Sequence, residues 1–399
     1  MLSKSTLPIF TAVAFALSTL AHSHPQRRDG PITIPDFHNN SIEDNGMIIN
    51  DLAWSLVDAG TLQRRTNGPA AIVPLSKKGH VYTAPITVGT PRPDANPQSP
   101  SAKAQMFHVI IDTGKRTSWL ASSLGASPTP PHTYNPEWSF TSKNLNKEFS
   151  AYGDVKGEWF WDVFDVGGIK TEKVRFGCAK ERGMYKSEFD GVIGIADSTS
   201  PEHVDQSFFS SVLQQHSKVN SFAFYFGKER SEFQLGLTKE SIASMRCYPM
   251  ITVTQASDMA GLTTANIFVD KRPLFREILP HGTEAIFNSG SPQVSGPPGQ
   301  VLKLYRRLGG REWRDTFIIP CNNKRVVSFL FSGDNTRWEI SGSLIEDPND
   351  EVKPGMCRGA IRANRNVHGN LWILGLDFMS GRHIGYDFGI HKICMADAP

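Results

Sequence analysis

The sequence predicts an all-β protein built from two similar halves. Glycine occurs 34 times and proline 26 times, which indicates many turns. From Thr66 onward, several segments are rich in β-branched and aromatic residues, which is typical of strands. These strand candidates are residues 80–89, 107–111, 159–166, 222–226 and 326–331. Helical spacing is rare, and the best short candidates are residues 208–215 and 301–308.

An internal repeat defines the two halves. Residues 109–114 read Val-Ile-Ile-Asp-Thr-Gly, and residues 285–290 read Ala-Ile-Phe-Asn-Ser-Gly. Each copy is followed by a later strand candidate that ends in glycine, at Gly194 in the first half and at Gly375 in the second. The acid of the first copy lies 82 residues before Gly194, and the amide of the second lies 87 residues before Gly375. Two halves of similar design therefore follow each other along the chain.

Length and composition limit the classes of function. The chain has 399 residues, which is enough for two domains, and 39% of them are apolar, so a sizeable core can form. The 42 basic and 39 acidic residues give a net charge of +3. Because no run of Lys and Arg is longer than a pair, we expect no binding to nucleic acid.

The first residues are typical of a secretory signal. Lys4 supplies a positive charge, residues 7–20 form an apolar stretch, and small residues follow at 21–23. The alternative is a membrane anchor, but a transmembrane helix needs about 20 apolar residues and this stretch is shorter. We therefore interpret residues 1–23 as a signal peptide and expect a secreted protein that does not associate with membranes.

Residues 24–65 are expected to form a separable leader. The segment contains prolines, one expected helix at residues 48–62 and a glycosylation sequon at residues 39–41. It ends at Arg64-Arg65, a dibasic pair of the kind at which exported precursors are often cut. The alternative is that these arginines carry only solvated charge.

Five cysteines in an exported chain indicate a disulfide with cysteines left over. We expect a bond between Cys321 and Cys357. Cys178, Cys247 and Cys394 cannot all pair with one another, so at least one of them is a free thiol or an intermolecular partner. No Cys-x-x-Cys or His-x-x-x-His spacing is present, so no metal site is expected.

Several short motifs occur in a specific order between residues 80 and 399. They are Asp112-Thr113-Gly114 with Trp119 seven residues after the acid, Tyr134-Asn135-Pro136, Tyr152-Gly153 with Val166-Gly167-Gly168-Ile169, Phe189-Asp190-Gly191-Val192-Ile193-Gly194, Asn288-Ser289-Gly290 with Ser295-Gly296-Pro297, Trp372-Ile373-Leu374-Gly375, and Tyr386-Asp387-Phe388-Gly389. A lone Asp-Thr-Gly would be weak, but the ordered set resembles the pepsin-like aspartic peptidases over nearly all of this range.

The resemblance implies an all-β, bilobal pepsin-like fold with a central cleft and a β-hairpin flap. It places an N-terminal lobe at residues 66–245 and a C-terminal lobe at residues 246–399, with the leader as a propeptide that covers the cleft. It implies a monomer without a cofactor that takes a peptide or protein in the cleft. The implied site residues are Asp112 and Asn288 at the catalytic positions, with Tyr152, Gly114 and Gly290 at substrate-binding positions.

Asn288 stands where the resemblance calls for a second aspartate. The intact mechanism uses two carboxylates that share one proton and hold a water, and their like charges drive the two pKa values apart. A carboxamide can hold a water and donate a hydrogen bond, but it cannot take up and release a proton. Without a charged neighbour, the Asp112 carboxyl should ionise more readily than in an intact pair. Deamidation of Asn288 would restore the acid, although rigid buried loops usually resist it.

Other residues near the two loops also depart from the family pattern. Lys115 replaces the usual serine, and its ammonium either reaches Asp112 and favours the carboxylate or points to solvent. Pro292 replaces a usual Ser or Thr, and Leu376 stands where the family usually has Asp, although Asp377 follows it.

The expected flap, residues 152–167, is two residues shorter than the common pattern of the family. Tyr152 is retained, so a lid over the cleft is expected; the alternative role of this tyrosine is cross-strand packing.

Three functions remain open from the sequence. The first is a secreted pepsin-family protein with peptide hydrolysis lost or strongly reduced, whose cleft binds a peptide, a partner protein or a glycan. The second is an active secreted aspartic endopeptidase with an unusual Asp/Asn site. The third is a scaffold repurposed for proton transfer or cyclisation of a small molecule, since a fold does not fix a function.

Overall fold

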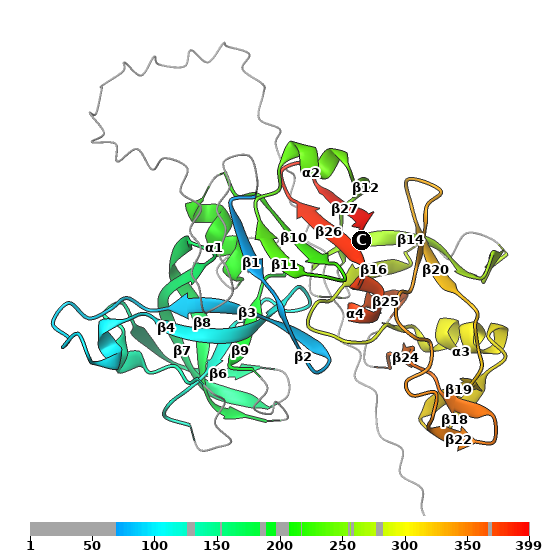
Figure 1. Ribbon diagram of the computed structural model, residues 1–399, viewed down its shortest axis with the longest axis horizontal. Coiled ribbons are helices and arrows are strands. Elements are labelled where there is room, and N and C mark those ends of the chain that lie inside the picture. The colour runs from blue at the N-terminus through cyan, green and yellow to red at the C-terminus, as the bar shows by residue number, and fades with distance from the viewer. Residues whose placement is uncertain are drawn as a thin grey trace, which may run out of the picture. The chain divides into compact units, whose positions relative to one another are not determined.

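The structure is a computed structural model that describes residues 69–398, except 126–131, 152–153, 184–188, 197–206, 217, 254–255, 257–258, 277–281 and 366–368. These residues belong to one unit of the chain, Asn50–Pro399. The expected signal peptide and leader lie outside the described residues. Strands dominate the described part, so the all-β prediction is confirmed (Figure 1).

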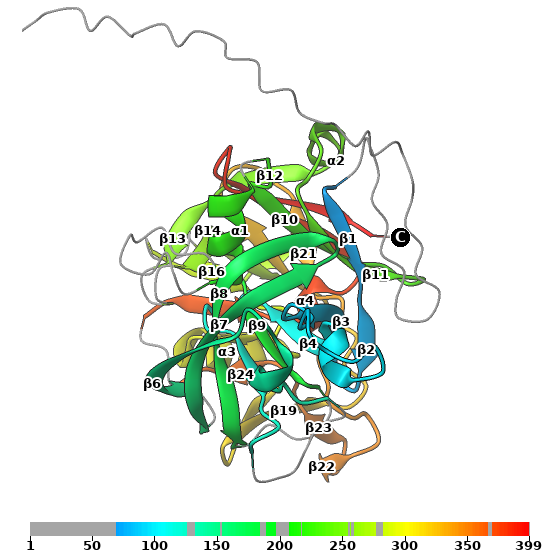
Figure 2. The same cartoon turned by 90° about the vertical axis from the view of Figure 1, so that its left-hand side faces the viewer.

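The first half of the chain forms an eight-stranded sheet. Its order is β2 (Ser76–Lys78), β3 (Val81–Val88), β4 (Gln105–Asp112), β9 (Gly191–Gly194), β5 (Trp119–Ala121), β8 (Ile169–Arg182), β7 (Val155–Val166) and β6 (Lys143–Ala151). Most neighbours are antiparallel, and β7 and β8 form a long curved hairpin (Figure 2). The exceptions are β4 with β9 and β5 with β8, which pair in parallel near the middle of the sheet.

The second half forms a nine-stranded sheet and a smaller one. The larger sheet has the order β21 (Arg337–Glu339), β20 (Val327–Phe331), β14 (Met259–Val269), β16 (Glu284–Phe287), β25 (Leu371–Leu374), β17 (Ser295–Gly296) and β24 (Arg362–Ala363), with β13 (Ile251–Val253) and β15 (Arg272–Pro273) paired to β14. The smaller sheet contains β18 (Arg311–Trp313), β19 (Thr316–Pro320), β23 (Met356–Arg358) and β22 (Glu351–Lys353).

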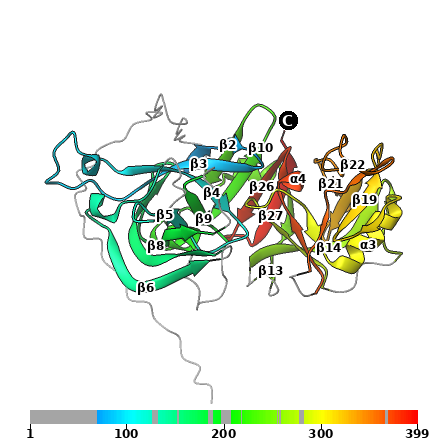
Figure 3. The ribbon, with the colours of Figure 1, turned by 90° about the horizontal axis from the view of Figure 1, so that it is seen from below.

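A six-stranded sheet takes strands from both halves. Its order is β1 (Ala71–Pro74), β11 (Ser231–Leu235), β10 (Ser221–Phe226), β26 (Arg382–Asp387), β27 (Lys392–Asp397) and β12 (Arg246–Pro249). Figure 3 shows β26 and β27 between the strands of the first half and those of the second. The two halves of the sequence are therefore joined by a common sheet and not only by a linker.

Few helices accompany the sheets in the described part. They are α1 (Phe208–Gln215), α2 (Lys239–Ala243), α3 (Pro298–Arg307) and α4 (Leu376–Met379), with 3₁₀ turns η1 (Pro100–Ala102) and η2 (Pro136–Trp138). The start of α1 is fixed by Ser207, whose hydroxyl accepts hydrogen bonds from the backbone N–H groups of Phe209 and Ser210. The two helices predicted after Thr66 are confirmed, and α3 starts earlier than predicted because Pro298 occupies its first turn. The helix expected at residues 48–62 lies outside the described residues.

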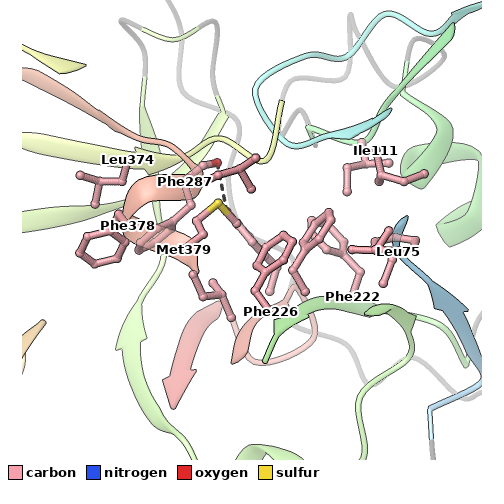
Figure 4. Packing of buried hydrophobic residues seen from close by; sticks show 14 of the residues in the cluster. Leu75, Ile111, Phe222, Phe226, Phe287, Leu374, Phe378 and Met379 are labelled. Carbon is pink, nitrogen blue, oxygen red and sulfur yellow. Dashed lines mark hydrogen bonds between the residues drawn. The ribbon is translucent and has the colours of Figure 1, made fainter. Parts of the chain in front are cut away.

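One buried apolar cluster extends through both halves. Figure 4 shows side chains from the first half packed towards side chains from the second. The labelled members are Leu75, Ile111, Phe222, Phe226, Phe287, Leu374, Phe378 and Met379. Burial of one such aromatic or aliphatic side chain is worth about 1.5–3 kcal/mol. The segments that carry residues 112 and 288 both end beside this cluster, which gives the two loops a rigid base.

Candidate active site

Two parallel strand pairs deliver the repeated loops. In the first half, β4 pairs in parallel with β9, and Asp112 lies opposite Gly194. In the second half, β16 pairs in parallel with β25, and Phe287, the residue before Asn288, lies opposite Leu374. The repeat seen in the sequence is thus a repeat of local structure, and Asn288 occupies in its loop the place that Asp112 has in the other.

The two loops hold each other through reciprocal hydrogen bonds. The Thr113 hydroxyl donates to the carbonyl of Phe287 at 2.7 Å and accepts from the backbone N–H of Ser289 at 2.9 Å. The Ser289 hydroxyl donates to the carbonyl of Ile111 at 2.6 Å and accepts from the backbone N–H of Thr113 at 3.1 Å. Each hydroxyl therefore satisfies two backbone groups in a buried place, which fixes the loops relative to one another.

Two glycines bring the acid and the amide close to the opposite loop. A Cβ placed on Gly114 would lie 2.2 Å from Nδ2 of Asn288, and one placed on Gly290 would lie 2.3 Å from Cγ of Asp112. Neither position has room for a larger residue, since real Cβ atoms essentially never approach a heavy atom this closely. The family resemblance implies that these glycines occupy substrate-binding positions. In the structure, Gly114 packs against the side chain of Asn288, and Gly290 packs against that of Asp112.

Burial dominates the electrostatics of Asp112. Its residue is only 7% exposed, and this desolvation raises the pKa of its carboxyl above the ordinary value. Three weaker effects oppose the rise in pKa: the backbone N–H of Gly114, the charge of Lys115 and the backbone N–H of Gly290. The Gly114 N–H donates to Asp112 Oδ1 at 2.7 Å. The absence of a second, negatively charged carboxylate is therefore not the main influence on the pKa of Asp112.

The amide of Asn288 has a defined orientation. Its Oδ1 accepts a hydrogen bond from the backbone N–H of Gly290 at 2.9 Å, which repeats the contact between Gly114 and Asp112. The orientation follows from this bond, because the N–H needs an oxygen acceptor. Nδ2 consequently lies on the side of Gly114, where it can donate hydrogen bonds but cannot release a proton.

Lys115 influences the acid electrostatically. Its side chain is half-buried, and its positive charge lowers the pKa of Asp112. Of the two orientations left open by the sequence, the structure thus favours the one in which the ammonium acts on Asp112. This effect is smaller than that of burial.

Other predicted residues support the loops. Trp119 is buried against the ring of Phe189, with 6.2 Å between ring centroids. Beyond the second loop, the backbone N–H of Leu376 donates to the carbonyl of Ser291 at 2.8 Å, and that of Asp377 donates to the carbonyl of Pro292 at 2.9 Å. The substituted positions 292 and 376 are thus part of the backbone bonding around the Asn288 loop.

The expected flap, residues 152–167, contains β7, which pairs with β6 on one side and with β8 on the other. Ala151, the last residue of β6, lies opposite Val155, the first residue of β7. Tyr152 lies outside the described residues, and its role stays a prediction.

The cysteines form two disulfides. Cys321 is bonded to Cys357, as predicted, and Cys247 is bonded to Cys394. The latter bond joins directly opposed residues of β12 and β27, a relation that spacing along the chain could not reveal. Cys178 is a buried free thiol, and burial raises its pKa to about 11.

Two features of the site were not predicted. One is the reciprocal bonding of Thr113 and Ser289; the shared hydroxyl at the same place in both repeats was its signal. The other is Tyr386, a buried tyrosine of β26 whose hydroxyl donates to the Phe287 carbonyl at 3.4 Å. Burial raises its pKa, so this hydroxyl stays protonated as a donor. Its motif was visible in the sequence, but its contact with the loops was not.

The described residues contain no metal-binding cluster and no membrane-spanning helix. No group of three or more His, Cys, Asp and Glu side chains among them is arranged to hold a metal ion. Within the same residues, no helix is both long enough and apolar enough to span a membrane.

Comparison with known proteins agrees with this geometry. The family model described as eukaryotic aspartyl protease matches residues 81–398. Camel (Camelus dromedarius) chymosin is 23% identical over 79% of this chain and 81% of its own length. Marmoset (Callithrix jacchus) pepsin A is 25% identical over 79% of this chain and 80% of its own length. Herring (Clupea harengus) cathepsin D is 26% identical over 89% of this chain and 91% of its own length. The family match covers both loops and the strands from β3 to β27, and this chain belongs to the eukaryotic aspartyl protease family.

Proposed function

We propose that this chain is a secreted pepsin-like protein that binds a peptide or protein in its cleft and has lost, or strongly reduced, peptide hydrolysis. The carrying observation is the amide of Asn288, which takes the place that symmetry with Asp112 assigns to a second carboxyl. The rest of the loop architecture is intact, so the site keeps its shape and lacks only a group that can exchange a proton.

The chemistry of the pair supports this proposal. An ionised Asp112 can accept a proton from a water, and the Nδ2 of Asn288 can donate a hydrogen bond to a carbonyl oxygen. The amide cannot pass a proton to the departing amine, which an acid in its place would do. General acid–base catalysis contributes about 10²–10⁴-fold to rate, so the loss falls in this range or beyond. Lys115 lowers the pKa of Asp112, which makes its carboxylate a weaker base toward the water.

The remaining parts of the proposal concern processing and organisation. Residues 1–23 act as a signal peptide, and residues 24–65 as a propeptide-like leader that is cut after Arg65. The lobes are residues 66–245 and 246–399, with the six-stranded sheet shared between them. Tyr152 lies over the cleft as part of a shortened flap, and the protein is a monomer. Two disulfides in the described part are consistent with an exported protein.

The proposal is tested by assaying cleavage of denatured casein between pH 2 and 8. We expect the natural protein to cleave casein at least about 10²-fold more slowly than Asn288→Asp, or not at all, because this variant restores a second carboxyl. A matched control is the double variant Asp112→Asn/Asn288→Asp, which again has one carboxyl and should be inactive. Peptide mass analysis establishes that residue 288 of the natural protein is unmodified Asn.

A second candidate function is an active endopeptidase, which is favoured by the intact hydrogen bonding of the loops and the retention of Asp112. Turnover by the natural protein at a rate close to that of Asn288→Asp, abolished by Asp112→Ala, would establish this second function and refute the first.

A further inference from the structure

A basic hollow lies in the second half of the chain, apart from the residues of the two loops. Its volume is about 800 Å³. It is formed by the turn between β14 and β15, the exposed side of α3 and the segment before β20, which lie near one another in Figure 1. Six basic side chains line it: Lys271, Arg272, Lys303, Arg306, Arg307 and Arg325.

Little negative charge from the described residues offsets this cluster. Among them, Asp270 is the one acidic residue that lines the hollow, against six basic ones, although the whole chain has a net charge of only +3. Asp270 is already engaged, because its carboxylate lies 3.7 Å from Arg325 and accepts the backbone N–H of Val326 at 3.1 Å. Lys303 lies over the ring of Phe275, at 4.0 Å from its centre, a contact that adds no negative charge to the hollow.

Local structure explains only part of the cluster. Arg306 and Arg307 lie in the last turn of α3, where the helix dipole favours positive charge. That effect does not account for Lys271 and Arg272, which come from a separate hairpin and face the same hollow. Like charges repel one another over a Debye length of about 8 Å, so a bound anion would relieve the repulsion among these side chains.

The chemistry of the lining indicates the kind of anion. Guanidinium groups bind phosphate and sulfate through two parallel hydrogen bonds, and Arg272, Arg306 and Arg307 approach the hollow from two elements. A hollow of about 800 Å³ falls within the range of small-molecule sites, roughly 300–1,000 Å³. A small molecule that carries several phosphate or sulfate groups can contact cations on both sides of the hollow at once.

We propose that this hollow binds a compact anion that carries several phosphate or sulfate groups. The site is independent of the Asp112–Asn288 pair and does not depend on whether that pair hydrolyses peptides. The phosphate and sulfate sources share this chemistry and are distinguished by the probes below.

The test is isothermal titration calorimetry of the full chain with two probes. Inositol hexakisphosphate presents phosphates, and a heparin-derived hexasaccharide presents sulfates. We expect one probe molecule to bind per chain, with affinity that falls as salt is raised. Inorganic phosphate should bind far more weakly, since it offers a single group.

Variants locate the binding. Arg272→Gln/Arg306→Gln removes one cation from each side of the hollow and should weaken binding by at least about tenfold, because each guanidinium donates charge-assisted hydrogen bonds to the anion. Lys170→Gln/Lys392→Gln removes the same charge from exposed positions elsewhere and should change affinity by less than about twofold. Thermal melting establishes that both variants are folded.

Several results would overturn the proposal. One is that neither probe binds; another is that both double variants lose affinity equally, which would mean attraction to the general surface charge. Tighter binding of a polyglutamate peptide than of either probe would indicate an acidic protein segment as the ligand. Preference for one of the two probes would support the proposal and identify phosphate or sulfate as the recognised group.

Discussion

Replacement of Gly290 by alanine should disturb the packing on which the Asp112 carboxyl rests. A Cβ at this position would lie 2.3 Å from both Cγ and Oδ2 of Asp112, well inside the 3.0 Å below which a neighbour has to shift. The neighbour is not the loose end of a flexible side chain. It is a buried carboxyl held at 2.7 Å by the backbone N–H of Gly114. The substitution therefore forces the carboxyl or the loop to move by about 1 Å.

Two costs add up in Gly290→Ala. Overpacking of a well-packed site costs about 1–3 kcal/mol. If the displaced carboxyl loses its bond from Gly114, a hydrogen bond to a charged group worth about 1.5–3 kcal/mol is also lost. We expect the free energy of unfolding to fall by about 2.5–6 kcal/mol in total.

Urea unfolding measures this loss. With a slope of about 3 kcal/mol per molar urea, the midpoint should fall by about 1–2 M. Gly299→Ala is the matched control, because nothing lies within 4 Å of its Cβ position and it is inside α3. Alanine is preferred to glycine there by about 0.5–1 kcal/mol, so the control should be slightly more stable than the natural protein. If Gly290→Ala unfolded at the same midpoint as the natural protein, the close contact with Asp112 would be refuted.

Three further predictions concern the same structure. Burial raises the pKa of Asp112, so the folded chain binds more protons than the unfolded chain between the two pKa values, and stability falls as pH rises through them. In thermal unfolding, Asp112→Asn should thus be more stable than the natural protein at pH 7 but not below about pH 3. Its free energy of unfolding at pH 7 should be higher by about 1.4 kcal/mol for each whole unit by which burial raises the pKa of Asp112; a difference that does not depend on pH would contradict this. Thr113→Val leaves the buried backbone N–H of Ser289 without a partner and removes the shorter of the two hydrogen bonds to the Phe287 carbonyl, so a loss of about 2–4 kcal/mol is expected in urea unfolding, whereas Thr113→Ser should retain most of the stability. Serine at both Cys247 and Cys394 should cost up to about 5 kcal/mol, because the bond spans 147 residues, and an unchanged melting temperature would show that the bond does not stabilise the fold.

The sequence predicted the local structure well where the pattern was strong. Residues 208–215 are the helix α1, and residues 326–331 correspond to β20, because apolar periodicity and turn residues mark both clearly. β7 begins four residues earlier than its predicted start at 159, because residues 155–158, which include the polar Lys156 and Glu158, already pair with β6 and β8. The internal repeat correctly indicated two equivalent strand and loop units.

What the sequence could not reveal depends on distances across the fold. It identified the missing like charge beside Asp112, but not the burial that has the largest effect on the pKa of this acid. It left the direction of Lys115 open, because a side chain on a loop has no periodicity to orient it. The partner of Cys247 was also undetermined, since only the pairing of β12 with β27 brings Cys394 opposite it.

The shared six-stranded sheet has a consequence for how the chain is made. β10 lies between β11 and β26 in this sheet. One edge of β10 therefore stays unpaired during synthesis until β26, about 160 residues further along the chain, has been made. Until then, Phe222, Phe224 and Phe226 border an open edge of the kind that invites aggregation. Pairings this distant in sequence form slowly. A nascent chain paused between the two halves would need protection from its neighbours, however well its earlier strands had already formed.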